Sequence, residues 1–190
     1  MEETKPQLQM IWPPERLRTP LTWNLPAGYT LRTYRPGDDE GYIALMRQAG
    51  FSAWNADNLA AVLKTSLPQG VFFIIYDRTA QITATTVATH NPSDLHPFGG
   101  ELGWVAVSPA HQGHGLGQIA SAAVTNRFMQ AGYSEIYLRT DDFRLAAIKT
   151  YLKLGWIPLL FAPDMEARWN TVLDQLHMRP ISGQTKQCLS

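Results

Sequence analysis

Three glycines at alternate positions, Gly113, Gly115 and Gly117, lie within the stretch SPAHQGHGLG. An apolar strand-like run precedes the stretch and a helix-like run follows it. A glycine-rich turn between a strand and a helix points backbone N–H groups at one place, and the helix N-terminus adds roughly half a positive charge. A phosphate or pyrophosphate is therefore the natural ligand of this loop.

The spacing of the glycines excludes three common nucleotide-binding motifs. A dinucleotide fingerprint, G-x-G-x-x-G, fails because Gln118 occupies its last position. A P-loop requires Gly-Lys-Ser/Thr, and no such triplet follows these glycines. A kinase-type loop would lie in a hairpin and not before a helix.

The pattern that does fit is Gln/Arg-x-x-Gly-x-Gly/Ala, here QGHGLG. The strand-like run ELGWVAVSP precedes it, and the block AIKTYLKLGW follows it. In these blocks and in the order of its elements, the chain resembles the GCN5-related N-acetyltransferase (GNAT) superfamily over residues 29–161. The resemblance implies a loop that wraps the pyrophosphate of acetyl-CoA, the acetyl-donating cosubstrate. The cofactor contacts that it implies are Val105, Ala106, Val107, Gln112, Gly113, His114, Gly115, Leu116, Gly117 and Lys153.

The chain departs from the family pattern at three positions. Gln112 and His114 stand where the family often carries cations, so backbone amides should contribute more of the phosphate binding. Arg144 stands where the family often places asparagine. Its guanidinium could pair with a CoA phosphate, or it could be a solvated helix residue.

Transfer of an acetyl group to an amine requires two proton movements: the amine must lose a proton, and the departing thiolate must gain one. By resemblance, Tyr151 is the general acid, although a core tyrosine on a helical stripe would look the same. Glu101 opens the strand before the loop at the position of the family's catalytic glutamate, where a plain surface glutamate is the alternative. His90 and water are the other candidates for the base. Strict alternation puts Glu101 on the same strand face as Val105 and Val107, opposite Trp104 and Ala106.

The resemblance implies an N-acetyltransferase that moves the acetyl group to a primary amine by direct attack in a ternary complex. The acceptor, a small-molecule or peptide amine, should meet Phe51, Trp54, His90 and Phe98. A non-catalytic module that binds or senses acyl-CoA is the alternative function. No H-E-x-x-H motif or cysteine cluster is present, so no metal is expected.

The patterns of apolar and turn residues along the chain predict secondary-structure elements in the order β-α-α-β-β-β-α-β-α-β. This order predicts an α/β (α+β) fold in which helices flank a mixed central sheet with an antiparallel N-terminal half. Asn55, Asp141 and Asp142 are expected to cap helices, and Gly155 is expected to end one.

Three regions are expected along the chain. Residues 1–26 hold five prolines and should form an extended arm, which Trp12 and Trp23 would pack on the body or on a second subunit of a homodimer. Residues 27–178 form the acetyltransferase domain, and residues 179–190 form a flexible tail.

The composition suits an ordinary globular protein, with 45% hydrophobic and 17% charged residues. Sixteen basic and sixteen acidic residues cancel, so neither nucleic acid nor an anionic membrane is an expected partner. The longest apolar run, VFFIIY, is far shorter than the roughly 20 residues of a membrane span. The acidic, polar N-terminus does not resemble a signal peptide. The single cysteine, Cys188, excludes a disulfide framework. A cytoplasmic location is therefore expected.

Overall fold

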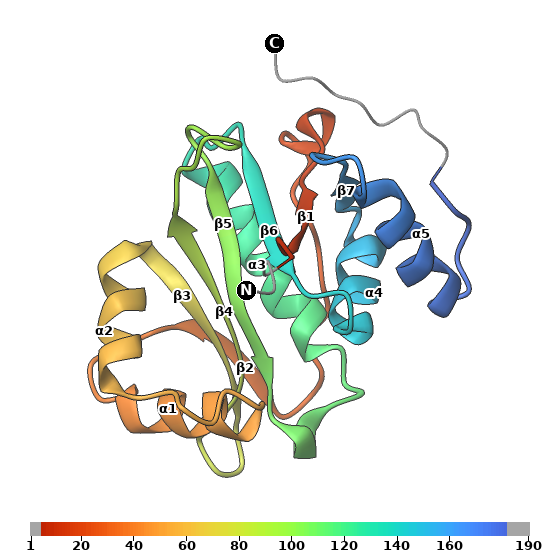
Figure 1. Cartoon of the computed structure of the whole chain (residues 1–190). Helices are drawn as coiled ribbons and strands as arrows, with labels where there is room; N and C mark the ends of the chain where they lie inside the picture. Colours follow the sequence, from red (N-terminus) through yellow and green to blue (C-terminus); the bar gives the residue numbers. More distant parts are fainter. Residues whose placement is uncertain (1–4, 182–190) are drawn as a thin grey trace.

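A seven-stranded sheet in the order β2-β3-β4-β5-β6-β1-β7 runs through the protein (Figure 1), of which the computed structural model describes residues 5–181. Neighbouring strands are antiparallel except β5 and β6, which are parallel. Helices flank the sheet, which confirms the predicted fold class. The strands are β1 (Leu8–Ile11), β2 (Tyr29–Thr33), β3 (Ser66–Tyr76), β4 (Gln81–His90), β5 (Gly100–Val107), β6 (Ile136–Thr140) and β7 (Ile157–Leu159). The helices are α1 (Asp39–Gln48), α2 (Ala56–Thr65), α3 (Leu116–Gln130), α4 (Leu145–Leu154) and α5 (Met165–Gln175).

The two faces of the sheet are covered by different helices (Figure 1). On one face, Tyr42 and Leu45 of α1 and Val62 of α2 pack with Phe73 of β3 in one buried cluster. On the other face, α3 and α4 pack together with strand residues in a second cluster that includes Phe128. Within residues 5–181, no helix combines the length and the apolarity that crossing a membrane would require.

The expected N-cap of α2 and the expected C-terminal end of α4 are confirmed, but the expected N-cap of α4 is wrong. Asn55 caps α2 by accepting hydrogen bonds from the N–H groups of Asp57 and Asn58, and Gly155 ends α4 with a left-handed φ of 105°. Neither Asp141 nor Asp142 caps α4, because Arg144 is its N-cap residue and no side chain caps it. The two carboxylates bind arginines instead.

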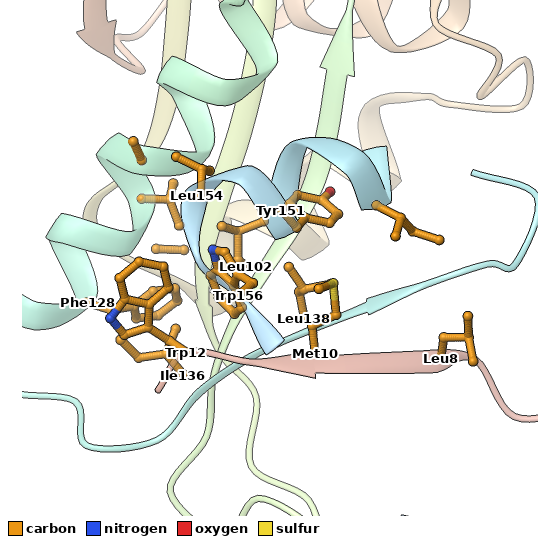
Figure 2. Packing of buried hydrophobic residues seen from close by; sticks show 14 of the residues in the cluster. Leu8, Met10, Trp12, Leu102, Phe128, Ile136, Leu138, Tyr151, Leu154 and Trp156 are labelled. Carbon is orange, nitrogen blue, oxygen red and sulfur yellow. The ribbon is translucent and has the colours of Figure 1, made fainter. Parts of the chain in front are cut away.

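The N-terminal segment supplies a strand in the interior of the sheet. Strand β1 lies between β6 and β7 and is antiparallel to both. Its Leu8 and Met10, and Trp12 just after it, are at most 2% exposed and belong to the same buried cluster as Tyr151 and Leu154 of α4 (Figure 2). The ring of Trp12 contacts that of Trp156 edge to face, with 5.5 Å between the centroids. The order of elements did not predict this strand. The boundaries at residues 26 and 178 stay predictions, and residues 182–190 of the expected tail lie outside the described residues.

A buried histidine ties β1 to the loop between β4 and β5. The ring of His96 stacks on that of Tyr137 in β6 with 4.0 Å between the centroids. Its Nε2 lies 2.8 Å from Oε1 of Gln9 in β1, so this nitrogen is the donor. Burial lowers the pKa of His96, which Glu135 and Glu101 only partly oppose, so the ring is neutral near pH 7.

A bulge in β5 overturns the expected alternation of its side chains. The register with β4 shifts between Thr85 and Val87, and Trp104 adopts a φ of 54°. Because the bulge adds one residue, the face changes partway along the strand. Trp104 and Ala106 contact the α1–α2 side, whereas Val105 packs on the side of α4. The prediction that the side chain of Glu101 lies on the same face of β5 as those of Val105 and Val107 is therefore wrong.

Truncating Trp12 tests whether the N-terminal segment is part of the core. We expect Trp12→Ala to lower the free energy of unfolding by about 3–5 kcal/mol, as for other buried aromatic residues. Phe98→Ala is the matched control: its side chain is 73% exposed, so its effect should stay within about 0.5 kcal/mol. Urea unfolding followed by tryptophan fluorescence and circular dichroism measures both. Equal effects would contradict the position of this segment in the core.

Candidate functional site

Strands β5 and β6 pair only over a short length, and two cavities open where they separate. Their parallel pairing joins Gly100–Leu102 to Ile136–Leu138 and then ends. The first cavity, the loop cavity, has a volume of about 560 Å³ and lies between the glycine loop, β5 and α4. The second, the strand-end cavity, has a volume of about 200 Å³ and is lined by β5, the end of β6 and the start of α4. Val105, Ala147 and Tyr151 line both.

The glycine loop has the geometry of an anion cradle. Gly113 and Gly115 have φ values of 82° and 73°, the left-handed region that favours glycine, and open space lies where their Cβ atoms would be. Gly117 lies against β5, since an added Cβ would come within 3.3 Å of the Val107 side chain. Among residues 5–181, no acceptor is found for the backbone N–H groups of residues 113–118. The loop and first turn of α3 therefore present a row of free donors.

The glycine loop itself carries no lysine or arginine, and the cationic side chains near it come from α4. Lys149 and Lys153 of α4 line the loop cavity, as does Gln112. His114 does not line it; its Nδ1 lies 3.0 Å from the carbonyl oxygen of Gln112 and therefore donates to it. Nδ1 of His111 lies 2.8 Å from the hydroxyl of Tyr29. The free donors of the loop itself are therefore its backbone amides, with the two lysines of α4 across the cavity.

Tyr151 lies where the two cavities meet. It is 5% exposed, and Figure 2 shows its hydroxyl at the upper end of the ring, next to the α4 ribbon. Burial raises the pKa of Tyr151 above its ordinary value, and nearby Arg144 opposes this only in part. The hydroxyl is therefore protonated at neutral pH and can donate a proton.

Glu101 lines the strand-end cavity and is held by two partners. Its Oε1 accepts from Nε of Arg139 at 2.7 Å, and its Oε2 accepts from Nη2 of Arg139 at 3.0 Å. Nδ2 of Asn91 also donates to Oε2 at 2.6 Å. The Glu101 side chain is only 12% exposed. Since a carboxylate offers about four acceptor positions, one remains after these three bonds.

The other predicted acceptor residues divide between the cavity and its surroundings. Phe51 lines the strand-end cavity, whereas Trp54 is buried behind it against Trp104, 4.5 Å away between ring centroids. His90 and Phe98 line neither cavity. His90 binds the hydroxyl of Tyr133 instead, with 2.9 Å between Nδ1 and the oxygen.

Two predicted cofactor residues also lie away from the loop cavity. Ala106 is buried in the cluster with α1 and α2, because the bulge turns it to that side. Arg144 lines the strand-end cavity, where its Nε donates to Asp141 Oδ2 at 2.9 Å. Val105, Val107, Gln112, Gly113, Gly115, Leu116, Gly117 and Lys153 do line the loop cavity.

Several residues of the strand-end cavity or its support were not predicted from the sequence, among them Gln7, Asn91, Trp104, Arg139 and Asp141. Arg139, a charge within a short apolar strand, was the one detectable signal. Gln7 reaches the cavity only because β1 enters the sheet, and Trp104 only because of the bulge. Over residues 5–181, no three histidine, cysteine or acidic side chains gather as metal ligands would.

Comparison with known proteins agrees with this geometry. The model of the acetyltransferase (GNAT) family matches residues 32–156, and the chain belongs to this family. Mycothiol acetyltransferase of Nocardia farcinica is 29% identical over 142 residues, which cover 70% of this chain and 47% of the relative. The mycothiol acetyltransferase of Rhodococcus erythropolis is also 29% identical, over 70% of this chain and 48% of the relative. This chain thus spans about half the length of these relatives.

Solved structures share the fold. A GCN5-related N-acetyltransferase from Sphaerobacter thermophilus has a TM-score of 0.63 and 18% identity, with 82% of this chain and 50% of that chain covered. The ribosomal-protein-S18-alanine N-acetyltransferase of Escherichia coli has a TM-score of 0.54 and 19% identity, with coverage of 67% and 76%.

Substitutions in the glycine loop test whether backbone groups dominate CoA binding. Gly115→Val forces a β-branched residue into the left-handed region and fills the open cradle, so CoA affinity should fall at least about tenfold. His114→Ala should change it less than about threefold, since a donor that already serves a backbone carbonyl is lost. Calorimetric titration with CoA measures both, and circular dichroism checks that each variant is folded. Equal losses would contradict the backbone cradle.

Proposed function

We propose that this protein is an N-acetyltransferase that moves the acetyl group of acetyl-CoA to a primary amine by direct attack in a ternary complex. The observation that supports this most is the meeting of two cavities at Tyr151, one suited to a pyrophosphate and one to a small acceptor. The mycothiol acetyltransferase relatives favour a small molecule as acceptor. A homodimer stays a prediction.

In the proposed complex, CoA lies in the loop cavity. Its pyrophosphate accepts hydrogen bonds from the N–H groups of residues 113–118, and Lys149 or Lys153 is near an outer phosphate. The pantetheine arm runs along β5 beyond Leu102, where the strand has no β6 partner and its backbone groups can bind the amides. This path leads the thioester toward Val105 and Tyr151.

The acceptor amine approaches from the strand-end cavity. Its nitrogen attacks the thioester carbonyl, forms the C–N bond and gives a tetrahedral intermediate. The C–S bond then breaks, the sulfur takes the proton of the Tyr151 hydroxyl, and the amine proton passes to a base. The products are the N-acetylated amine and free CoA. Proton exchange with solvent restores the tyrosine and the base.

Glu101 is the better candidate for the base of the two side chains considered. It lines the strand-end cavity, whereas His90 lines neither cavity and binds Tyr133. Arg139 and Asn91 leave Glu101 one acceptor position, which suits a proton relayed through water. We therefore propose that Glu101, acting through a water molecule, is the general base.

A non-catalytic module that binds acyl-CoA would need only the loop cavity. The strand-end cavity and a protonated tyrosine at its junction favour catalysis. Thiol release distinguishes the two: if CoA binds but no amine accelerates release of the thiol, the module is correct and the transferase is not.

Removing the Tyr151 hydroxyl tests the general acid. We expect Tyr151→Phe to lower kcat by about 10²–10³-fold while CoA affinity changes little, because the ring remains and only the proton donor is lost. Since the pKa of Tyr151 is raised, the wild type should keep this acid protonated up to at least pH 10. Thiol release with acetyl-CoA and an amine measures the rates. Tyr133→Phe, remote from both cavities, is the control, and equal rates in all three proteins would contradict the role.

Neutralising Glu101 tests the base. Glu101→Gln keeps the shape of the side chain but removes its charge, so kcat/KM should fall by about 10²-fold for an amine that is protonated at neutral pH. Part of the loss should be recovered at high pH, where the amine deprotonates without help. The exposed Asp94→Asn is the charge-matched control and should behave as wild type. A Glu101→Gln variant with an unchanged pH–rate profile would refute the proton transfer.

A further inference from the structure

Two arginines in the strand-end cavity each have hydrogen-bonding capacity that the protein does not use. Arg139 is bound to Glu101 through Nε and Nη2, and Arg144 is bound to Asp141 through Nε. Within the part of the chain that the structure describes, Nη1 of Arg139 and both Nη atoms of Arg144 have no acceptor. Their side chains are 45% and 40% exposed. Each guanidinium is thus fixed along one edge and free at another.

These pairs contribute little to stability as surface ion pairs, since an exposed pair typically changes the folding equilibrium constant by less than about fivefold. The effect of these pairs is to fix the orientation of the two guanidinium groups. Arg144 also lies over the ring of Phe51, with 5.3 Å between Cζ and the ring centroid, and this contact further restricts it. A planar guanidinium that is held in this way is preorganised for a carboxylate.

The charges of the cavity balance. Two arginines face two carboxylates, Glu101 and Asp141, so the lining has no net charge. A ligand that carries one positive and one negative group can enter such a site without adding net charge, whereas a plain cationic amine would add one positive charge that nothing in the lining balances. The unused hydrogen-bond donors of the cavity belong to the arginines. The one remaining acceptor position of Glu101 is the position proposed to take the proton of the amine through water.

The position of the cavity relative to Tyr151 sets the orientation of the ligand. The reacting amine must be at the junction with the loop cavity, near Val105, Ala147 and Tyr151. The volume of about 200 Å³ is below the range of about 300–1,000 Å³ that is usual for drug-sized ligands, so the acceptor is small. Phe51 and Trp104 offer it apolar contact.

We propose that the acceptor is a small amino acid-like molecule, in which an amine at the junction is joined to a carboxylate that Arg139 and Arg144 bind. This inference rests on the proposed acetyl transfer and names its substrate class. The anion could also be a phosphate, but two negative charges would disturb the balance of the lining, so a carboxylate is favoured.

Matched acceptors test the proposal. A panel of amino acids and their amides is assayed for thiol release with acetyl-CoA, and rates are referred to the concentration of unprotonated amine. We expect kcat/KM for the best amino acid to exceed that of its amide by about 10- to 100-fold, as for hydrogen bonds to a charged group. β-Alanine should also be used better than 2-aminoethyl phosphate.

Arginine variants link the preference to the cavity. Arg144→Gln should raise KM for the carboxylate acceptor about tenfold or more and leave KM for its amide within about twofold. Arg144→Lys should recover part of the loss, because it restores the charge without the fork. Arg78→Gln, an exposed arginine that lines neither cavity, is the control and should match the wild type.

The outcomes separate the two proposals. If no amine of any kind accelerates thiol release, the acetyltransferase proposal fails. If amides or uncharged amines serve as well as amino acids, acetyl transfer stands and the carboxylate proposal is overturned. The same holds if Arg144→Gln raises KM for the amino acid and for its amide equally. Preference for 2-aminoethyl phosphate would replace the carboxylate by a phosphate and also overturn it.

Discussion

The separation of β5 from β6 after Leu102 is the constraint on which the site depends. Three residues of parallel pairing hold the strands together, and beyond them β5 keeps only β4 as a partner. The bulge at Trp104 then turns Val105 toward α4 and Trp104 toward Phe51, so that one strand contributes to both cavities. A continuous β5–β6 ladder would close the path between the loop cavity and the strand-end cavity. Because of this gap, the free backbone of β5, the open loop and Tyr151 border two adjoining cavities.

The N-terminal strand allows this gap to exist without loosening the sheet. β6 pairs with β5 over only three of its five residues, and β1 pairs with the other edge of β6 over four residue pairs. Leu8, Met10 and Trp12 are buried in the same cluster as Tyr151 of α4 (Figure 2). The same segment brings Gln7 to the strand-end cavity, where it donates to Asp141. A segment far from the glycine loop in sequence is therefore part of both the core and the site.

Local patterns could be predicted from the sequence, and contacts between distant segments could not. The glycine spacing from Gly113 to Gly117, the cap at Asn55 and the end at Gly155 depend on a few neighbouring residues, and the structure has them as expected. The position of β1 in the sheet depends on its pairing with β6 and β7, which are more than a hundred residues away in the sequence. The bulge depends on the register with β4, and one extra residue is enough to move Ala106 and Val105 to faces that strict alternation does not give. Likewise, Arg144 lies on the strand-end cavity because Asp141 binds it, a pairing that no motif specifies.

We propose that the two cavities form one path for acyl transfer, with Tyr151 at the junction. A crystal structure with acetyl-CoA bound would show this path. We expect the pyrophosphate on the backbone N–H groups of residues 113–118, the pantetheine along β5 beyond Leu102, and the thioester sulfur within hydrogen-bonding distance of the Tyr151 hydroxyl. CoA bound in the loop with its thioester directed away from Tyr151 and the strand-end cavity would contradict it.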